Sequence, residues 1–121
     1  AEDATVLDME DDAGPAAAVV LDDGQVLTLE SPVVLGRNPV APASHPLARV
    51  VQVTDESMRV SKTHLLVAAV GDQVKVVDLG ATNGIHIEAD GAKTRLEARG
   101  EQALTPGTVV HFGGRSLRLA P

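Results

Sequence analysis

Residues 64–78 read HLLVAAVGDQVKVVD, two short aliphatic runs on either side of Gly71-Asp72. In the second run valines alternate with Gln73 and Lys75, the period of two that puts apolar side chains on one face of a strand. Gly-Asp tolerates the positive φ that tight hairpin turns require. The stretch therefore predicts two strands, 64–70 and 73–78, joined as a β-hairpin.

The same combination of a short apolar run and turn residues recurs from Ala16 onward. It predicts further strands at 17–22, 25–30, 32–36, 49–53, 84–88, 93–97, 108–112 and 115–119. Between them stand the turn pairs Asp23-Gly24, Asp90-Gly91, Pro106-Gly107 and Gly113-Gly114. No segment of ten or more residues has helical periodicity. About ten closely spaced strands predict an all-β fold, a sandwich of two antiparallel sheets.

Composition limits both the core and the chemistry. The 121 residues fit one domain, and 44% are apolar, but Phe112 is the only aromatic residue. The core must therefore consist of Val, Leu, Ile and Ala, and β-branched residues favour strands. Cysteine is absent, which excludes disulfides and thiolate metal sites. His45, His86 and His111 lack metal-ligand spacing and carboxylate neighbours, so we expect no metal and no cofactor.

Charge is concentrated at the N-terminus. The first fourteen residues hold six of the 17 acidic residues and none of the 10 basic ones, which predicts an acidic tail over 1–16 and a nearly neutral domain over 17–121. Without a basic face or aromatic surface, nucleic acid is not an expected partner. The apolar runs are too short to cross a bilayer, and the N-terminus is unlike a secretory signal. We expect a cytoplasmic location and no membrane contact by this domain. The same expectation holds if the domain is the cytoplasmic part of a larger or membrane-anchored protein.

Three loop signatures stand beside predicted strands: Gly36-Arg37, Ser61-Lys62-Thr63-His64 and Thr82-Asn83-Gly84. Loops of a sandwich cluster at its two ends, so these three are expected to converge. An arginine fork matches phosphate geometry, and Ser and Thr hydroxyls donate to the remaining oxygens. Arg59 and Lys62 flank Ser61 and add positive charge. The parts predict a pocket for a phosphate carried on a peptide.

Residues 38–48 contain three prolines. Proline cannot donate to a strand ladder, so we expect a long surface loop here, at the rim of the Arg37 site.

The order Gly-Arg, Ser-x-x-His, Asn-Gly, over residues 17–119, resembles the forkhead-associated (FHA) domain family. The resemblance implies an eleven-stranded β-sandwich that binds phosphothreonine peptides through loops at one end, without catalysis. It further implies phosphate contacts from Arg37, Ser61, Thr82, Arg59 and Lys62, a ligand main-chain contact from Asn83, and scaffold roles for Gly36, His64 and Gly84. Ala81 departs from the family pattern, where many members have serine.

The expected function is a phosphothreonine-dependent interaction module in Ser/Thr kinase signalling, whose partner is a phosphothreonine protein, a kinase or its substrate. Because the second pKa of a phosphate is about 6, binding should weaken as pH falls through that value. The alternative is a scaffold or oligomerisation domain that uses the same loops without phosphate. An enzyme is not expected, since Ser61 and His64 have no elbow motif and no orienting acid. Thr5, in an acidic context, is a candidate phosphorylation site that the pocket of the same or another copy would capture.

Overall fold

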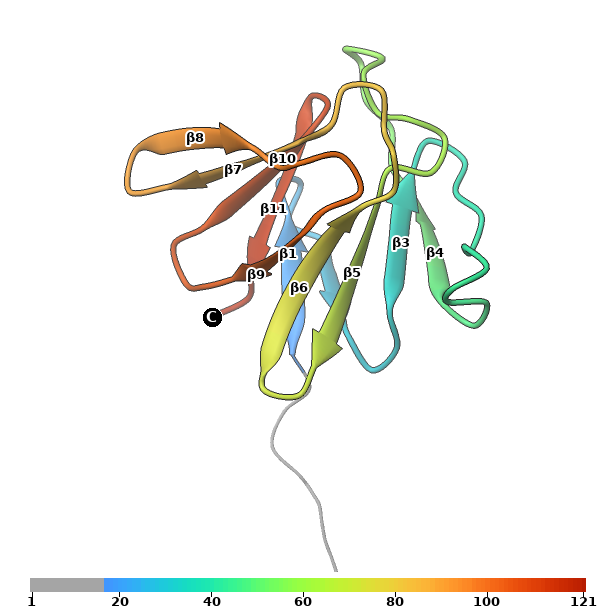
Figure 1. Cartoon of the computed structure of the whole chain (residues 1–121), viewed down its shortest axis with the longest axis horizontal. Helices are drawn as coiled ribbons and strands as arrows, with labels where there is room; N and C mark the ends of the chain where they lie inside the picture. Colours follow the sequence, from blue (N-terminus) through green and yellow to red (C-terminus); the bar gives the residue numbers. More distant parts are fainter. Residues whose placement is uncertain (1–16) are drawn as a thin grey trace, which may run out of the picture.

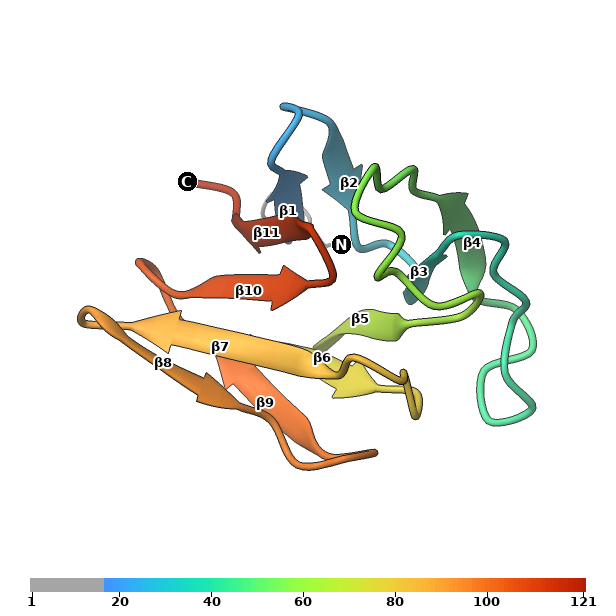
Figure 2. The same ribbon diagram turned by 90° about the horizontal axis from the view of Figure 1, so that it is seen from above.

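Two sheets face each other across one core in the computed structural model, which describes residues 17–121 (Figures 1 and 2). The six-stranded sheet has the order β2 (Val26–Thr28), β1 (Ala18–Leu21), β11 (Arg115–Leu119), β10 (Val109–Phe112), β7 (Ile85–Ala89), β8 (Ala92–Arg95). The five-stranded sheet has the order β4 (Arg49–Gln52), β3 (Val33–Gly36), β5 (Leu65–Val70), β6 (Gln73–Asp78), β9 (Glu101–Leu104). The predicted all-β sandwich is confirmed.

Predicted turn residues join neighbouring strands where expected. β5 and β6 pair antiparallel around Gly71, whose φ is 63°. Between β7 and β8, Asp90 and Gly91 have φ values of 53° and 80°, the two positive values of a type I′ hairpin turn. Gly107, after Pro106, has a φ of 89°, which suits the third position of a type II turn.

The sheets depart from the predicted pattern at two edges. β4 pairs with β3 in parallel because residues 37–48 carry the chain back past β3 before β4 begins, a length that a parallel connection requires. β9 was not predicted, since Glu101 and Gln102 have low strand propensity. It forms because β6 offers a free edge, against which Val74 pairs with Leu104 and Val76 with Gln102.

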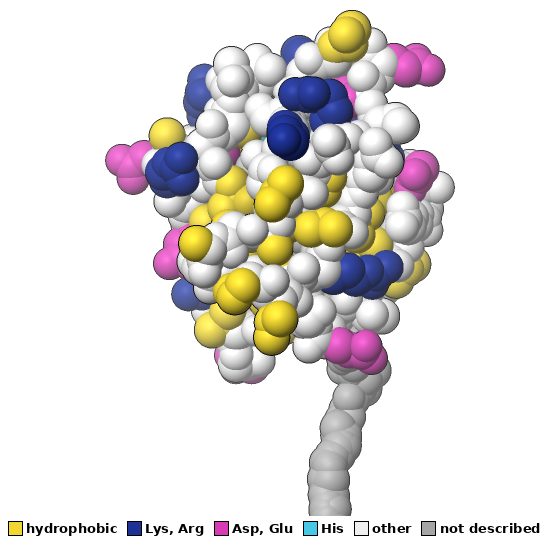
Figure 3. Space-filling view, turned by 90° about the vertical axis from the view of Figure 1, so that its right-hand side faces the viewer, with side chains coloured by type: hydrophobic (Ala, Val, Ile, Leu, Met, Phe, Trp, Pro, Cys, Tyr) yellow, Lys and Arg dark blue, Asp and Glu magenta, His cyan; other side chains and the backbone are white. Residues whose placement is uncertain are grey.

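The core follows the period of two. Phe112, Ile85, Leu117 and Leu35 are among its fully buried side chains and lie between the sheets. A second, smaller cluster of Val34, Leu66 and Ala68 lies on the outer face of the five-stranded sheet. Figure 3 shows this side of the molecule, with apolar side chains gathered below Lys and Arg side chains at the upper, loop-bearing end.

Candidate functional site

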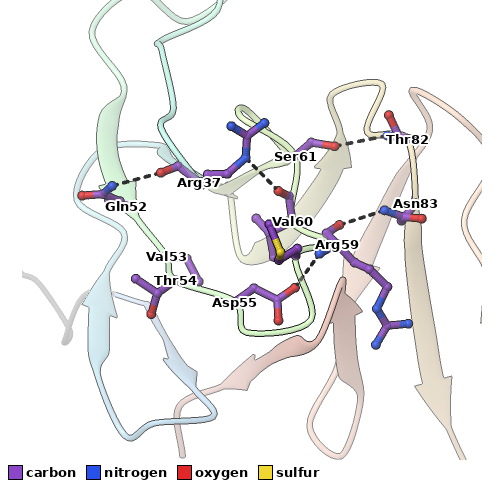
Figure 4. Close-up of a pocket in the computed structure, with 11 residues that line it drawn as sticks. Arg37, Gln52, Val53, Thr54, Asp55, Arg59, Val60, Ser61, Thr82 and Asn83 are labelled. Atoms are coloured by element: carbon purple, nitrogen blue, oxygen red, sulfur yellow. Dashed lines mark hydrogen bonds between the residues drawn. The ribbon is translucent and has the colours of Figure 1, made fainter.

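Three connections meet at the end of the sandwich drawn uppermost in Figure 1: 37–48, 53–64 and 79–84. An open cavity of about 650 Å³ lies there, which we call the loop cavity. Its lining comprises Arg37, Gln52, Val53, Thr54, Asp55, Met58, Arg59, Val60, Ser61, Thr82 and Asn83 (Figure 4). The structure thus brings together five of the residues that the sequence singled out, on connections that begin at strands of the five-stranded sheet.

Arg37 and Ser61 are joined through their main chains. The Arg37 amide donates to the carbonyl of Ser61 at 2.9 Å, and Arg37 Nε donates to the Val60 carbonyl at 3.4 Å. Gln52 Nε2 in turn donates to the Arg37 carbonyl at 3.1 Å. Within the described residues only Nε of this guanidinium is hydrogen-bonded, so its two terminal nitrogens stay available to an anion.

The Ser61 hydroxyl connects two of the three loops. Its oxygen accepts a hydrogen bond from the Thr82 amide at 3.2 Å. A hydroxyl that accepts from one side keeps its own hydrogen to donate elsewhere. Ser61 is therefore oriented as a donor beside the Arg37 guanidinium, the arrangement that a phosphate oxygen requires.

A hydrogen bond from its amide nitrogen orients the Asn83 side chain. Its Nδ2 donates to the Arg59 carbonyl at 3.1 Å, which leaves Oδ1 as an acceptor. An acceptor in this place suits the N–H groups of an extended peptide, in keeping with the predicted main-chain contact.

Arg59 and Lys62 lie differently from Arg37. The Arg59 guanidinium points away from that of Arg37 (Figure 4), and its Nε donates to Ser57 Oγ at 3.1 Å. Lys62 is exposed and outside the lining of the loop cavity, while its carbonyl accepts from the Asn38 amide at 3.1 Å. Their phosphate contacts stay predictions.

His64 supports the loops from below. It is fully buried, its Nδ1 accepts from the Ser61 amide at 3.0 Å, and its Nε2 lies 2.8 Å from the Gly84 carbonyl. Because Nδ1 accepts, the ring hydrogen is on Nε2 and is donated to Gly84. The ring also packs edge-to-face on Phe112, with centroids 5.8 Å apart. These contacts are compatible with the scaffold role that the resemblance implies, and the role stays a prediction.

Gly36 occupies a place that a larger residue does not fit, and Gly84 adopts a backbone conformation that other residues rarely adopt. A Cβ on Gly36 would overlap the carbonyl oxygen of Lys62, so the β3 end and the 53–64 connection approach only because the side chain is missing. Gly84 has a φ of 67°, and a Cβ there would lie 2.8 Å from Nε of Arg95.

Asp55 was missed by the sequence analysis. Its carboxylate accepts from the amides of Ser57, Arg59 and Gly114 and from the Ser57 hydroxyl. Partial burial raises the pKa of Asp55, but these hydrogen bonds outweigh it and hold the pKa well below its ordinary value. Asp55 thereby ties the 53–64 connection to the β10–β11 turn. The available signal was the Asp-x-Ser spacing of an Asx turn.

Asp78 was missed as well. It is buried at the end of β6 and accepts from the amides of Ala81, at 3.2 Å, and Arg99, at 3.1 Å. The carboxylate closes the turn that presents Thr82 and Asn83. Its signal was an aspartate at the end of an apolar run, directly before Leu79-Gly80.

The remaining expectations concern the N-terminal tail, metal binding, membrane spans and the proline-containing loop. Thr5 and the tail lie outside the described residues. Among residues 17–121, no three His, Asp or Glu side chains gather as a metal site, and the structure of that part has no helix long and apolar enough to span a membrane. Residues 38–48 form no strand, as predicted, and the Val40 amide donates to Thr63 Oγ1 at 3.1 Å.

Comparisons with known proteins agree with this architecture. Among curated proteins, no sequence matches this chain. The crystal structure of the FhaA FHA domain complexed with the intracellular domain of Rv3910 is similar, with 24% identity, a TM-score of 0.61 and coverage of 87% of this chain and 100% of that one. The FHA domain of CT664 from Chlamydia trachomatis has 21% identity, a TM-score of 0.64 and coverage of 87% and 96%.

A third structure is the MEK1 FHA domain in complex with the HOP1 pThr318 peptide, with 18% identity, a TM-score of 0.60 and coverage of 89% and 100%. At these identities the structures show the fold. The model of the family described as FHA domain matches residues 33–113, from β3 to the end of β10. The protein therefore belongs to the FHA domain family.

Proposed function

We propose that this domain binds phosphothreonine on a partner protein through the loop cavity. The observation that carries the proposal is the pairing of Arg37 and Ser61 in one open cavity, where neither the guanidinium ends nor the hydroxyl hydrogen has a partner among residues 17–121. The MEK1 FHA domain has been crystallised with a phosphothreonine peptide, which supports the same ligand class here. Asn83 then holds the peptide main chain.

Magnitudes favour a phosphate-dependent switch. A hydrogen bond to a charged group contributes roughly 1.5–3 kcal/mol. Two such bonds, discounted for non-additivity, give about 3 kcal/mol, or roughly a hundredfold between phosphorylated and bare peptide. Because a kinase must supply the phosphate, we propose a role in Ser/Thr kinase signalling, with the domain in the same compartment as that kinase.

Isothermal titration with the best peptide from a phosphothreonine library, against its unphosphorylated twin, tests the proposal. We expect a preference of about a hundredfold, lost in Arg37→Ala and reduced in Ser61→Ala. Arg118→Ala is the matched control, since it removes the same charge from an exposed position on β11. Affinity should also fall from about pH 7.5 to about pH 5, as the phosphate dianion is lost.

Equal affinity for the two peptides, unchanged in Arg37→Ala, would contradict the proposal. A partner bound through the same loops without phosphate would instead support the alternative function, a phosphate-independent scaffold.

A further inference from the structure

A second open hollow lies beside the loop cavity, on the outer face of the six-stranded sheet. It measures about 490 Å³, and we call it the basic hollow. Its ionisable lining residues are Arg59, His86, Lys93, His111 and Arg115. No Asp or Glu of the described part of the chain lines it.

Strand register explains this gathering. His86 on β7 pairs with His111 on β10 and, on its other side, with Arg95 on β8. Side chains of paired residues share a face of the sheet. Ile85 and Phe112, the neighbours of the two histidines, are buried in the core, so the imidazoles face outward. The sheet thus places basic groups from three strands in one row.

Part of the positive charge is already compensated. Arg115 lies 2.8 Å from Asp22 and 3.3 Å from Asp23, and His111 lies 2.7 Å from Glu88. Within residues 17–121, neither Lys93 nor Arg59 takes part in an ion pair. Lys93 lies opposite Glu88 in the strand register, but the Glu88 carboxylate lies 2.7 Å from His111. Among residues 17–121, two permanent cations therefore line the hollow without forming an ion pair.

His86 lies within the positive field of the hollow. Burial lowers the pKa of His86, and the nearby charges of Arg95, Lys93 and His111 lower it further. A site in which cations disfavour another positive charge is one in which a bound carboxylate is stabilised.

The basic hollow adjoins the loop cavity at Arg59. Arg59 lines both, and its guanidinium points away from Arg37 (Figure 4). Asp55 accepts from the amides of Arg59 and Gly114 at 3.0 Å each, so the wall between the two spaces is braced. A peptide seated at Arg37 needs only to continue past Arg59 to enter the hollow.

We propose that the basic hollow is a second anion-binding subsite, which takes a run of carboxylate side chains on the polypeptide that carries the phosphothreonine. The inference rests on the proposed function of the loop cavity. Neighbouring strands are about 4.8 Å apart, and an extended peptide advances about 3.3 Å per residue. A few acidic residues beyond the phosphothreonine therefore suffice to cross β10 and β7.

Titration of the full chain with extended peptides tests this subsite. The best phosphothreonine peptide from the library is extended by a short run of glutamates, on its N-terminal side in one peptide and on its C-terminal side in another. Matched peptides carry glutamines of the same number. Exposed ion pairs are individually weak, so two or three of them predict a gain of about fivefold for one glutamate peptide over its glutamine twin. High salt should remove the gain.

Variants then test whether the gain in affinity arises in the basic hollow. Lys93→Ala should reduce it and Lys93→Glu should abolish it, with affinity for the unextended peptide unchanged. Lys75→Ala is the matched control, because Lys75 lies on β6 in the other sheet and its loss should leave the gain intact.

No gain from either extension, or a gain that Lys93→Glu leaves unchanged, would overturn the subsite. Loss of phosphate dependence for the unextended peptide would instead overturn the proposed function, so the two failures are distinguishable.

Discussion

The loop cavity and the basic hollow are neighbours that the fold builds in different ways. The loop cavity is assembled from three connections that main-chain hydrogen bonds hold together, as between Arg37 and Ser61. The basic hollow gathers long side chains on the surface of paired strands. The first arrangement fixes the directions of hydrogen-bond donors, which is what selection of one chemical group requires. The second supplies a field, which is weaker and sensitive to salt.

The largest expected effect tests the backbone support of the loop cavity. Gly36→Ala should cost about 3 kcal/mol of unfolding free energy, because the new Cβ overlaps the Lys62 carbonyl, which is hydrogen-bonded to the Asn38 amide. Chemical denaturation measures it. Gly71→Ala is the control: its Cβ meets open space, and only its φ of 63° opposes the change, at about 1 kcal/mol. Equal losses in the two variants would show that β3 and the 53–64 connection are not tightly docked.

Arg37→Lys separates directed hydrogen bonding from charge. The variant keeps the positive charge but loses the planar fork, so phosphopeptide affinity should fall by about tenfold. In the basic hollow Lys93→Arg keeps charge and should change affinity for a glutamate-extended peptide by less than about twofold. Calorimetry on both variants measures the contrast. Equal sensitivity at the two positions would mean that the two regions bind by the same mechanism.

Asp55 joins the two regions, and its removal should loosen both. Asp55→Asn should cost about 2 kcal/mol at pH 7, since several hydrogen bonds to a charged group weaken. The folded pKa lies below the ordinary value of 3.8, so the carboxylate stabilises the fold above that pH and loses this contribution as pH falls toward the lowered pKa. The difference between the two proteins should therefore shrink in acid. Asp72→Asn, at an exposed turn, is the control and should be neutral throughout.

The smallest effect concerns His86. Lys93→Ala should raise the pKa of His86, because one of the cations that oppose its protonation is removed. Since the folded pKa lies below the ordinary value of 6.5, the neutral ring contributes stability above that pH, and this is lost as pH falls through the folded pKa. Proton NMR titration measures the shift. An unchanged pKa in Lys93→Ala, identical to that in Lys75→Ala, would remove Lys93 from the field of the hollow.

Local signals in the sequence were sufficient for the hairpins and for the site's principal residues. Alternating apolar residues and turn pairs act over a few positions, so the β5–β6 hairpin and the turn at Asp90-Gly91 follow from them directly. Arg37, Ser61 and Thr82 were recognised because each stands beside a strand end with the donors that phosphate requires.

Tertiary structure alone decided the features that depend on distant partners. The parallel pairing of β4 and the existence of β9 are set by free sheet edges, not by the propensity of their residues. The bracing by Asp55 depends on the β10–β11 turn, remote in sequence. The direction of the Arg59 side chain, toward the basic hollow and away from Arg37, likewise cannot be deduced from its neighbours in the sequence. The sequence by itself determined which groups are present, and the packing of the two sheets determined which of them face one another.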